Sequence, residues 1–469
     1  MIINKFKGKG VHDFLDFDIE FNEDVNFLVG GNGAGKTTAL KLINALITPD
    51  LKELCMTNFQ KIEVDINFNN ANYTIECERV TNKESHAYSR AKVLKIREVG
   101  IVTYEGNSDI LQGIYIPDLS LETTELEVYE NNWRKFNEVI DDVILKSANI
   151  PDFVTIEKIT SPVYLGLERK QRINQTDSFN EYYKERNRIV HNRVATPRQR
   201  LINGTLGVSL METEFLIQSE YRSLRYREEV LAKKLRDGIL MSAFKYTELN
   251  FDVSEYFNSQ FRSDKSKILG REAEIKEALE SAGILNKTLD NTVGEFFKKI
   301  EFALQKHTDS NSGNIDIEFL INKNQIDLIT RIVDIIDNHK DLMDRLFLPI
   351  NNFLDILNSF YKDTRKKIKI DTVGHLLIEK PNGKNSLVDA LSSGERQLLV
   401  MFGNIFFSKK KHRDQPVFII DEPELSLHIR WQEMLVNKVI SSNTGAQFIF
   451  ATHSPDIIGE LKSKNIKCR

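Results

Sequence analysis

A glycine-rich stretch near the start of the chain has the residue types of a phosphate-binding loop. Residues 30–37 read Gly-Gly-Asn-Gly-Ala-Gly-Lys-Thr and match the pattern G-x-x-x-x-G-K-[ST]. Glycine lets successive backbone amides turn toward phosphate oxygens, and the N-terminus of a following helix adds a favourable dipole. The residues expected to bind the phosphates of a nucleotide are Gly30, Asn32, Gly33, Ala34, Gly35, Lys36, Thr37 and Thr38.

The end of this loop carries polar groups suited to phosphoryl transfer. We expect Lys36 to act in catalysis by reaching the β- and γ-phosphates, and the Thr37 hydroxyl to complete a Mg²⁺ shell. The alternative is a glycine-rich turn that matches the pattern by chance. The context favours the phosphate loop, because it follows the strand-like run Val25–Val29 and precedes Ala39–Ile47, whose apolar residues recur at helical spacing.

Two acidic residues follow an apolar run late in the chain. Val417–Ile420 predicts a buried strand, and Asp421 and Glu422 come at its carboxyl end. We expect Asp421 to bind Mg²⁺, directly or through water, and Glu422 to polarise the attacking water as the catalytic base. Paired acids also occur where solvated loops begin. The phosphate loop in the same chain favours the catalytic interpretation.

A histidine and a serine-rich turn complete the set of candidates. His453 follows the apolar run Phe448–Ala451, where it can sense the γ-phosphate, although a histidine there is also often structural. Leu391–Gln397 reads Leu-Ser-Ser-Gly-Glu-Arg-Gln and opens a predicted helix at 397–407, which makes a second anion-binding helix N-terminus. One nucleotide cannot use both helix N-termini of the same subunit. The alternative is a serine helix cap with Glu395 in the first turn.

These four groups, in this order, resemble the motifs of the ABC-type ATPases, in particular their SMC and RecF-like branch. Residues 391–397 are similar to the LSGGQ or LSGGE signature of that family, with Ser393 where glycine is usual. The resemblance implies that ATP and Mg²⁺ are the cofactors and that two subunits sandwich two ATP molecules. Ser392 and Gly394 of one subunit would then face the γ-phosphate bound by Lys36 of the other, within a homodimer or a higher homo-oligomer.

The same resemblance indicates roles for three other segments. Residues 426–428 correspond to the D-loop of the family. The glutamine loop has two candidates, Gln60 and Gln112. For contact with the nucleotide base, the segment Lys5–Lys7 in the opening strands is the candidate.

Within the family, two segments resemble the ATPase subunits of bacterial antiviral systems such as PARIS and Septu: Asp421–His428 (DEPELSLH) and Ala451–Ile458 (ATHSPDII). The resemblance implies an ATP-hydrolysing regulatory subunit that senses infection through a phage-encoded trigger. Because only sixteen residues follow His453, we expect the toxic effector, a TOPRIM-type nuclease, to be a separately encoded chain. Two alternatives stay open: a RecF- or SMC-like DNA-repair ATPase that clamps DNA on ATP-driven dimerisation, and a nucleotide-gated scaffold that hardly hydrolyses ATP.

The order of the apolar runs, together with the resemblance, predicts an α/β fold. We expect an ABC-type ATPase head, with a P-loop core and antiparallel edge strands, that is interrupted by a large helical insertion. The alternating segments Ile62–Phe68 and Tyr73–Val80 predict two of the antiparallel strands. The expected divisions are residues 1–105 for the N-terminal lobe, 106–365 for the insertion with a head strand near 160–168, and 366–469 for the C-terminal lobe.

Long stretches of helix-favouring residues mark the insertion: Glu212–Met241, Ile268–Ala282 and Gln325–Leu357. A break at Ser310–Asn314 and the modest length argue against the very long coiled-coil arms of chromosome-organising ATPases. The segment 169–200 carries nine Lys or Arg against three Asp or Glu. This segment is a candidate surface for nucleic acid, and the alternative is a solvated basic helix face.

Charge and composition exclude several classes of protein. A net charge of −4 over 469 residues gives no overall positive charge to attract nucleic acid, so any such contact must be local. The three cysteines form no Cys-x-x-Cys pair for zinc or redox chemistry. No apolar run approaches the roughly 20 residues that span a bilayer, and the start lacks the apolar stretch of a signal peptide. We therefore expect a cytoplasmic protein with reduced thiols and no membrane contact.

Overall fold

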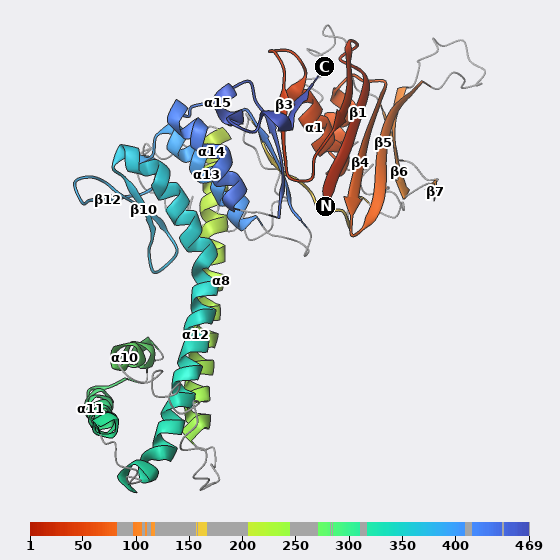
Figure 1. The fold of residues 1–469 in the computed structure, drawn as a ribbon. Coiled ribbons are helices and arrows are strands. Elements are labelled where there is room, and N and C mark those ends of the chain that lie inside the picture. Colours follow the sequence, from red (N-terminus) through yellow and green to blue (C-terminus); the bar gives the residue numbers. More distant parts are fainter. Residues whose placement is uncertain are drawn as a thin grey trace, which may run out of the picture. The chain divides into compact units, whose positions relative to one another are not determined.

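The chain, described here from a computed structural model, folds into two compact units (Figure 1). The first, called the head, consists of Met1–Gln218 and Phe353–Arg469, and the second, called the arm, consists of Ser219–Asn352. The structure describes residues 1–81, 97–105, 108–109, 114–117, 156, 158–166, 205–243, 271–281, 283, 285–309, 317–408, 415–442 and 445–468.

Five parallel strands form the central sheet of the head, in the order β15-β3-β14-β13-β9. They are β3 (Val25–Val29), β9 (Val163–Leu165), β13 (Val417–Asp421), β14 (Gln447–Ala451) and β15 (Asn465–Lys467). β13 and β14 are buried along their whole length, which explains their nearly continuous apolar sequences. Because the strands are parallel, their carboxyl ends lie at one edge of the sheet, where the loops carry the predicted motifs.

A second, antiparallel sheet covers the core on the other side of α1 (Lys36–Ile47) (Figure 1). Its strands follow the order β2-β1-β4-β5-β6-β7, and β8 also pairs with β6. They are β1 (Ile2–Val11), β2 (Leu15–Glu20), β4 (Lys61–Phe68), β5 (Ala71–Thr81), β6 (Arg97–Glu105), β7 (Ser108–Asp109) and β8 (Ile114–Pro117). Every second residue of β4 is buried, which confirms the strands predicted from alternation.

The head extends further into the middle of the sequence than the predicted divisions at 105 and 365 allow. The antiparallel sheet continues past residue 105, because β8 hydrogen-bonds along β6. The stretch Phe353–Tyr361 at the end of α12 (Ile317–Tyr361) belongs to the head and not to the insertion. It does so because Phe353 packs on Phe407 and Phe360 on Phe402.

Four helices contribute to the described part of the arm: α8 (Thr205–Ala243), α10 (Glu272–Ser281), α11 (Lys287–Asp309) and α12. α8 and α12 are single helices of 39 and 45 residues that run side by side within the arm (Figure 1). Leu235, Phe297 and Val333 belong to one buried apolar cluster, which holds the four helices together. The three predicted helices are present, whereas α11 was not predicted. The predicted break at Ser310–Asn314 lies outside the described residues.

The last part of the head adds a small sheet and the helices that flank the central one. The sheet contains β10 (Lys367–Ile370), β11 (Leu376–Glu379) and β12 (Asn385–Ser386), and the helices are α13 (Ser393–Phe407), α14 (Ile429–Ser442) and α15 (Pro455–Ile458). The short helix α2 (Leu51–Met56) lies earlier in the chain and packs against α1. The side chains of Cys77 and Cys468 are buried. In the described part of the chain, no helix combines the length and apolar character needed to cross a membrane.

Candidate nucleotide site

The glycine-rich loop connects β3 to α1 at the carboxyl edge of the central sheet. Gly33 and Gly35 have φ angles of 80° and 86°, in the left-handed region that only glycine adopts without strain. A Cβ on Gly35 would lie 2.7 Å from Cζ of Phe17, so this position also requires glycine to pack against β2. Asn32 and Gly33 are exposed at the tip of the loop. The loop therefore has the backbone shape that turns amides toward a phosphate.

Lys36 folds back over this loop. Its Nζ donates to the backbone oxygens of Gly30 at 2.8 Å and Gly31 at 3.3 Å, and its side chain is buried. α1 begins at Lys36 with no side-chain cap and no acidic residue in its first turn. The positive end of the helix dipole and the positive charge of Lys36 thus both lie at the glycine-rich loop, which suits binding of the β- and γ-phosphates of ATP.

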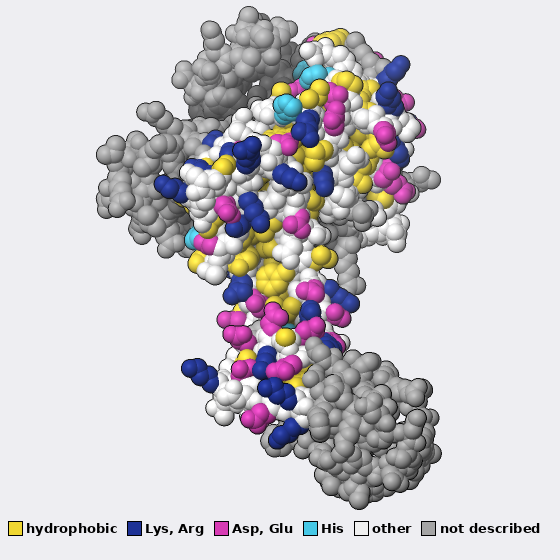
Figure 2. All heavy atoms as spheres, turned by 60° about the vertical axis from the view of Figure 1, so that its left-hand side comes forward, with side chains coloured by type: hydrophobic (Ala, Val, Ile, Leu, Met, Phe, Trp, Pro, Cys, Tyr) yellow, Lys and Arg dark blue, Asp and Glu magenta, His cyan; other side chains and the backbone are white. Residues whose placement is uncertain are grey.

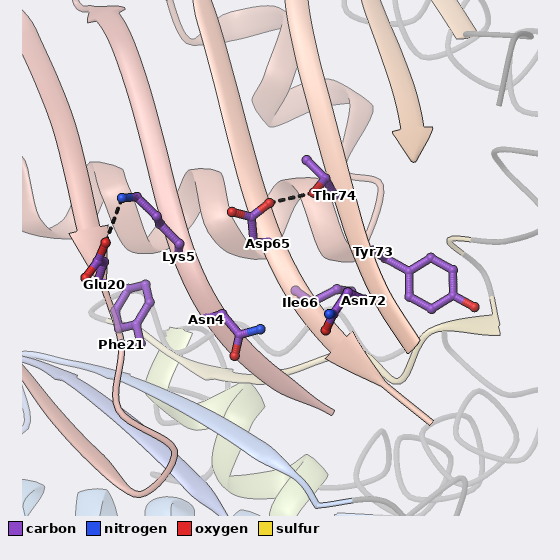
Figure 3. Close-up of a pocket in the computed structure, with 9 residues that line it drawn as sticks. All are labelled: Asn4, Lys5, Glu20, Phe21, Asp65, Ile66, Asn72, Tyr73 and Thr74. Atoms are coloured by element: carbon purple, nitrogen blue, oxygen red, sulfur yellow. Dashed lines mark hydrogen bonds and ion pairs between the residues drawn. The ribbon is translucent and has the colours of Figure 1, made fainter. Parts of the chain in front are cut away.

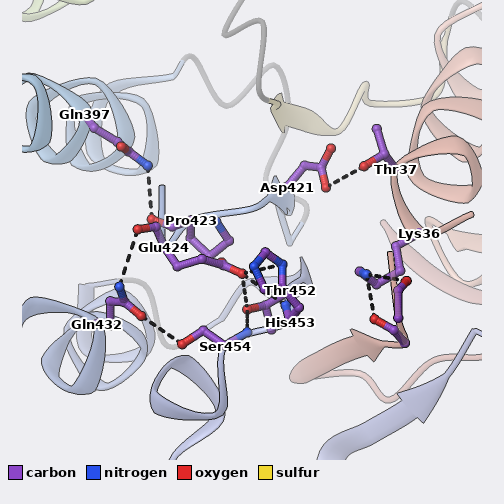
Figure 4. Close-up of polar contacts among 12 residues, drawn as sticks. Lys36, Thr37, Gln397, Asp421, Pro423, Glu424, Gln432, Thr452, His453 and Ser454 are labelled. Carbon is purple, nitrogen blue, oxygen red and sulfur yellow. Dashed lines mark hydrogen bonds and ion pairs between the residues drawn. The ribbon is translucent and has the colours of Figure 1, made fainter. Parts of the chain in front are cut away.

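Asp421 lies directly beside the loop, although it is 384 residues from Thr37 in the sequence. The Thr37 hydroxyl donates to Oδ1 of Asp421 at 3.1 Å (Figure 4). The hydroxyl of Tyr164 on β9 lies 3.5 Å from Oδ2 of Asp421. Burial raises the pKa of Asp421 to about 6, with a further contribution from the charge of Glu422, while the hydrogen bond from Thr37 opposes the rise. A hydroxyl and a carboxylate at a phosphate loop are ligands that Mg²⁺ prefers, so the residues fit this cation.

Glu422 has an unusual backbone. Its φ is 48°, in the left-handed region, and its N–H donates to the backbone oxygen of Ala451 at 2.8 Å. Backbone conformations of this kind cost free energy in a residue with a side chain and are concentrated at functional sites. Glu422 is only partly buried. This turn lets the chain place Asp421 in the sheet and the next carboxylate outside it.

His453 follows β14 and faces a second glutamate of the same segment. Its Nδ1 lies 3.3 Å from Oε1 of Glu424, which is almost fully buried. The same oxygen accepts from the His453 backbone N–H at 3.0 Å and from the Thr452 hydroxyl at 2.8 Å (Figure 4). The histidine side chain is half-exposed, so one ring edge is held inside and the other is available.

The predicted signature forms the first turn of α13. Ser392 is the N-cap, and together with Glu395 it forms a capping box, in which each side chain bonds to the other's backbone N–H. The Glu395 carboxylate is fully buried and accepts from Lys366 Nζ at 2.8 Å and from the Thr364 hydroxyl at 2.7 Å. Ser392 and Ser393 are exposed. The structural alternative of a serine cap is thus present, with Ser392 and Ser393 exposed and with Gly394 and Glu395 buried behind them.

The signature helix contacts the segment that follows Glu422. A Cβ on Gly394 would lie only 2.4 Å from the backbone oxygen of Ser426, so glycine is required for this approach. Ser426 itself has a φ of 63°. The Gln397 side chain donates through Nε2 to the backbone oxygen of Pro423 at 3.0 Å (Figure 4). The predicted signature and D-loop are therefore packed together in one subunit.

The predicted site residues fall into two groups, one around the phosphate loop and one at the signature. In the first group, Thr37 of the phosphate loop contacts Asp421, and Glu422 and His453 follow neighbouring parallel strands. The second group consists of Ser392 and Gly394. Among the described hydrogen bonds, none joins Ser392 or Gly394 to the phosphate loop of the same chain.

Three predictions concerned the base contact, the glutamine loop and nucleic acid. A base cannot stack on Phe6 of the Lys5–Lys7 segment, because this side chain is fully buried in the core. Gln60 is exposed beside Gly10 at the start of β4, and its role stays a prediction. Gln112 and the basic segment 169–200 lie outside the described residues.

Sequence reasoning missed Tyr164 and Glu424. Tyr164 lies in the strand expected near 160–168, but only the pairing of β9 with β13 shows that it reaches Asp421. Glu424 is visible as the third acid of the DEPE stretch, yet nothing in the sequence indicates that it faces inward to His453.

An open hollow of about 470 Å³ lies on the exposed face of the antiparallel sheet, away from this site (Figure 3). Its polar groups bond to one another. Lys5 Nζ lies 2.9 Å from Asp18 and 2.8 Å from Glu20, and these bonds raise the lysine pKa, while Thr74 donates to Asp65. The lining residues are Asn4, Lys5, Glu20, Phe21, Asp65, Ile66, Asn72, Tyr73 and Thr74. We assign no ligand to this hollow.

Comparison with known proteins gives relatives that include one named as a probable ATPase and one named as an endonuclease. The chain is 26% identical over 238 residues to the Retron Vc95 probable ATPase of Vibrio cholerae, which covers 46% of this chain and 43% of that protein. It is 25% identical over 150 residues to Endonuclease GajA of Bacillus cereus, covering 28% of this chain and 26% of that protein. The chain thus spans less than half the length of these curated relatives.

A solved structure and a family complete the comparison. An Smc head domain with an extended coiled coil from Pyrococcus furiosus is similar with a TM-score of 0.34 and 14% identity, covering 100% of this chain and 94% of that one. That TM-score is low, so the fold assignment comes from the strand order, the motifs and the family. The model of the AAA ATPase domain family matches residues 1–458, which confirms the predicted α/β ATPase fold, and the chain belongs to this family.

Proposed function

We propose that the protein is the ATP-hydrolysing regulatory subunit of an anti-phage defence system, in which it senses infection and controls a separate toxic effector. The observation that carries the ATPase part is the bond between Thr37 and Asp421, which brings the Mg²⁺ ligands of two distant motifs together at the phosphate loop. Lys36 then neutralises the phosphates, and Glu422 orients the attacking water.

The defence role is supported by the relatives and by two sequence segments. The relatives are named as an ATPase of a retron and as an endonuclease. The segments 421–428 and 451–458 support a likeness to the ATPase subunit of PARIS, AriA, with that of Septu, PtuA, as the next candidate. We propose a TOPRIM-type nuclease as the effector and a phage-encoded trigger.

We further propose that ATP is bound between two copies of the chain. The exposed side chains of Ser392 and Ser393 at the start of α13 support this arrangement, because they lie on the surface of the chain, where the nucleotide of a second copy can reach them. Ser392 and Gly394 of one subunit would complete the site formed by Lys36 of the other. Homodimers of this kind are the units of any larger assembly.

Mixing two inactive variants tests the sandwich. Lys36→Ala removes the phosphate lysine, and Ser392→Arg blocks the signature, so a mixed dimer contains one interface free of both changes. We expect the mixture to recover ATPase activity above the sum of the separate variants. If subunit exchange is verified and activity never exceeds that sum, the two residues do not act on the same ATP.

Purification of the tagged protein from its native operon tests the regulatory role. We expect a neighbouring gene product, a nuclease, to co-purify with the protein, and Lys36→Ala to change the amount recovered. Recovery of a lone monomer that binds DNA tightly in the presence of ATP would instead support the repair-type alternative. Figure 2 shows one face of the molecule, on which positive and negative side chains are interspersed over the described residues. This face therefore offers no continuous positive surface for the phosphates of DNA, which counts against the repair-type alternative.

A further inference from the structure

Glu424 is a buried carboxylate that the motif assignments leave without a role. Its side chain is 7% exposed, and a single oxygen, Oε1, makes all of its described contacts. These contacts are to the Thr452 hydroxyl, the His453 backbone N–H and the His453 ring (Figure 4). The other oxygen, Oε2, is buried and has no hydrogen-bond partner among the described residues.

Such a group is unfavourable for stability. Taking a carboxylate out of water costs several kcal/mol in real proteins, and the cost is recovered only when its lone pairs are satisfied. Glu424 satisfies one oxygen and not the other, so capping of the turn at residues 452–454 does not account for a charged residue here. A neutral glutamine could accept the same two bonds from Thr452 and from the His453 backbone. The contact that distinguishes a carboxylate is the one to the His453 ring.

The contact fixes the orientation of the ring. With Nδ1 3.3 Å from Oε1 of Glu424, the other ring nitrogen, Nε2, points away from the carboxylate on the half-exposed side of the ring. A protonated histidine donates from both nitrogens, so Nδ1 can serve the carboxylate while Nε2 serves a phosphate oxygen. We infer that Glu424 is a positioning residue that holds His453 for contact with the terminal phosphate of ATP. The inference rests on the proposed ATPase function and on the role predicted for His453 from the sequence, contact with the γ-phosphate.

The same segment is fastened to the helices on both sides. Gln397 on α13 bonds to the backbone oxygen of Pro423 at 3.0 Å. Gln432 on α14 bonds to the backbone oxygen of Leu427 at 2.9 Å and accepts from the Ser454 hydroxyl at 2.8 Å. Glu424 lies between these two attachments (Figure 4). A displacement of the signature helix therefore moves Glu424, and with it the histidine.

ATP hydrolysis and ATP binding by four variants of the full chain test the inference. They are Glu424→Gln, His453→Ala, the double variant, and Glu460→Gln as a control at an exposed glutamate close to the same turn. We expect Glu424→Gln to lower kcat roughly 10- to 100-fold, as when the carboxylate partner of a metal-bound histidine is removed. Its Kd for ATP and its Tm should match those of the Glu460→Gln control.

The double variant separates a positioning role from a structural one. If Glu424 acts through His453, the double variant has the kcat of His453→Ala alone, because residues that act as a unit are not additive. Multiplied losses, or a Glu424→Gln protein with normal kcat beside an impaired His453→Ala, would overturn the inference. A fall in Tm and in ATP binding together would also overturn it, in favour of a structural role. Normal kcat in His453→Ala would instead remove the proposed role of His453 itself.

Discussion

Replacement of Gly394 by alanine should disturb both the stability and the activity of the head. The new Cβ would lie 2.4 Å from the backbone oxygen of Ser426, whereas ordinary contact begins at 3.4 Å, so one of the two segments must retreat by about 1 Å. No side chain can rotate to relieve the clash, since the obstacle is backbone. The Ser426 turn is also held in place, because Leu427 donates its N–H to the Glu424 backbone oxygen at 3.0 Å.

Overpacking of this kind costs about 1–3 kcal/mol, which corresponds to a fall in Tm of a few degrees. Displacement by about 1 Å near reacting groups can cost on the order of 100-fold in rate, so we expect kcat to fall by roughly 10- to 100-fold. Thermal unfolding and steady-state ATP hydrolysis measure the two effects. Gly445→Ala is the matched control, because a Cβ there meets nothing within 4 Å. An unchanged Tm and kcat in Gly394→Ala would refute the packing argument.

Other substitutions make equally direct tests. Lys36→Ala should abolish ATP binding in a titration with a fluorescent ATP analogue, because it removes the cation at the phosphates. Glu422→Gln should keep that binding and halt turnover; retained hydrolysis would show that another group is the base. Burial raises the pKa of Glu212 from 4.5 to about 7. Between these two pH values the folded state keeps a proton that the unfolded state has released, so the free energy of unfolding falls as the pH rises from 4.5 to about 7. Glu212→Gln should abolish that fall and stabilise the protein at pH 8 by roughly 1 kcal/mol, discounted for solvent screening, in urea unfolding at several pH values. Gly403→Ala should lower Tm, because its Cβ would lie 2.3 Å from Cγ2 of buried Thr213, whereas an unchanged Tm would mean that α8 and α13 can separate freely.

Local patterns made the phosphate loop, the acidic pair and the signature predictable from sequence, because each is specified by residues adjacent in the chain. The strands were predictable for a similar reason: β13 and β14 are buried apolar runs, and β4 alternates. Their pairing partners were not, since parallel pairing joins residues hundreds of positions apart. Tyr164 is the example, because only the pairing of β9 with β13 shows that this side chain lies near Asp421.

The misses have particular physical causes. The inward direction of Glu424 depends on the left-handed backbone at Glu422. A left-handed conformation can be predicted at a glycine, but the sequence does not indicate it at a glutamate. α11 was missed because Thr288, Asn291 and Gly294 are weak helix formers, and its apolar face is stabilised by the arm cluster instead of by propensity. The lobe boundaries were misplaced because Phe353–Tyr361 is helical in pattern, yet its phenylalanines pack in the head.

The position of β3 has a consequence for synthesis of the protein on the ribosome. Both neighbours of this strand, β14 and β15, come from the end of the chain, and 422 residues separate Asn26 on β3 from Phe448 on β14. At translation speeds of about 5–20 residues per second, β3 waits roughly 20 to 80 s for its partners. Through that interval an apolar strand has both edges unpaired, which is the state that chaperones bind and that nascent chains aggregate from. Slow translation or scarce chaperones should therefore lower the yield of folded protein well before they affect its activity per molecule.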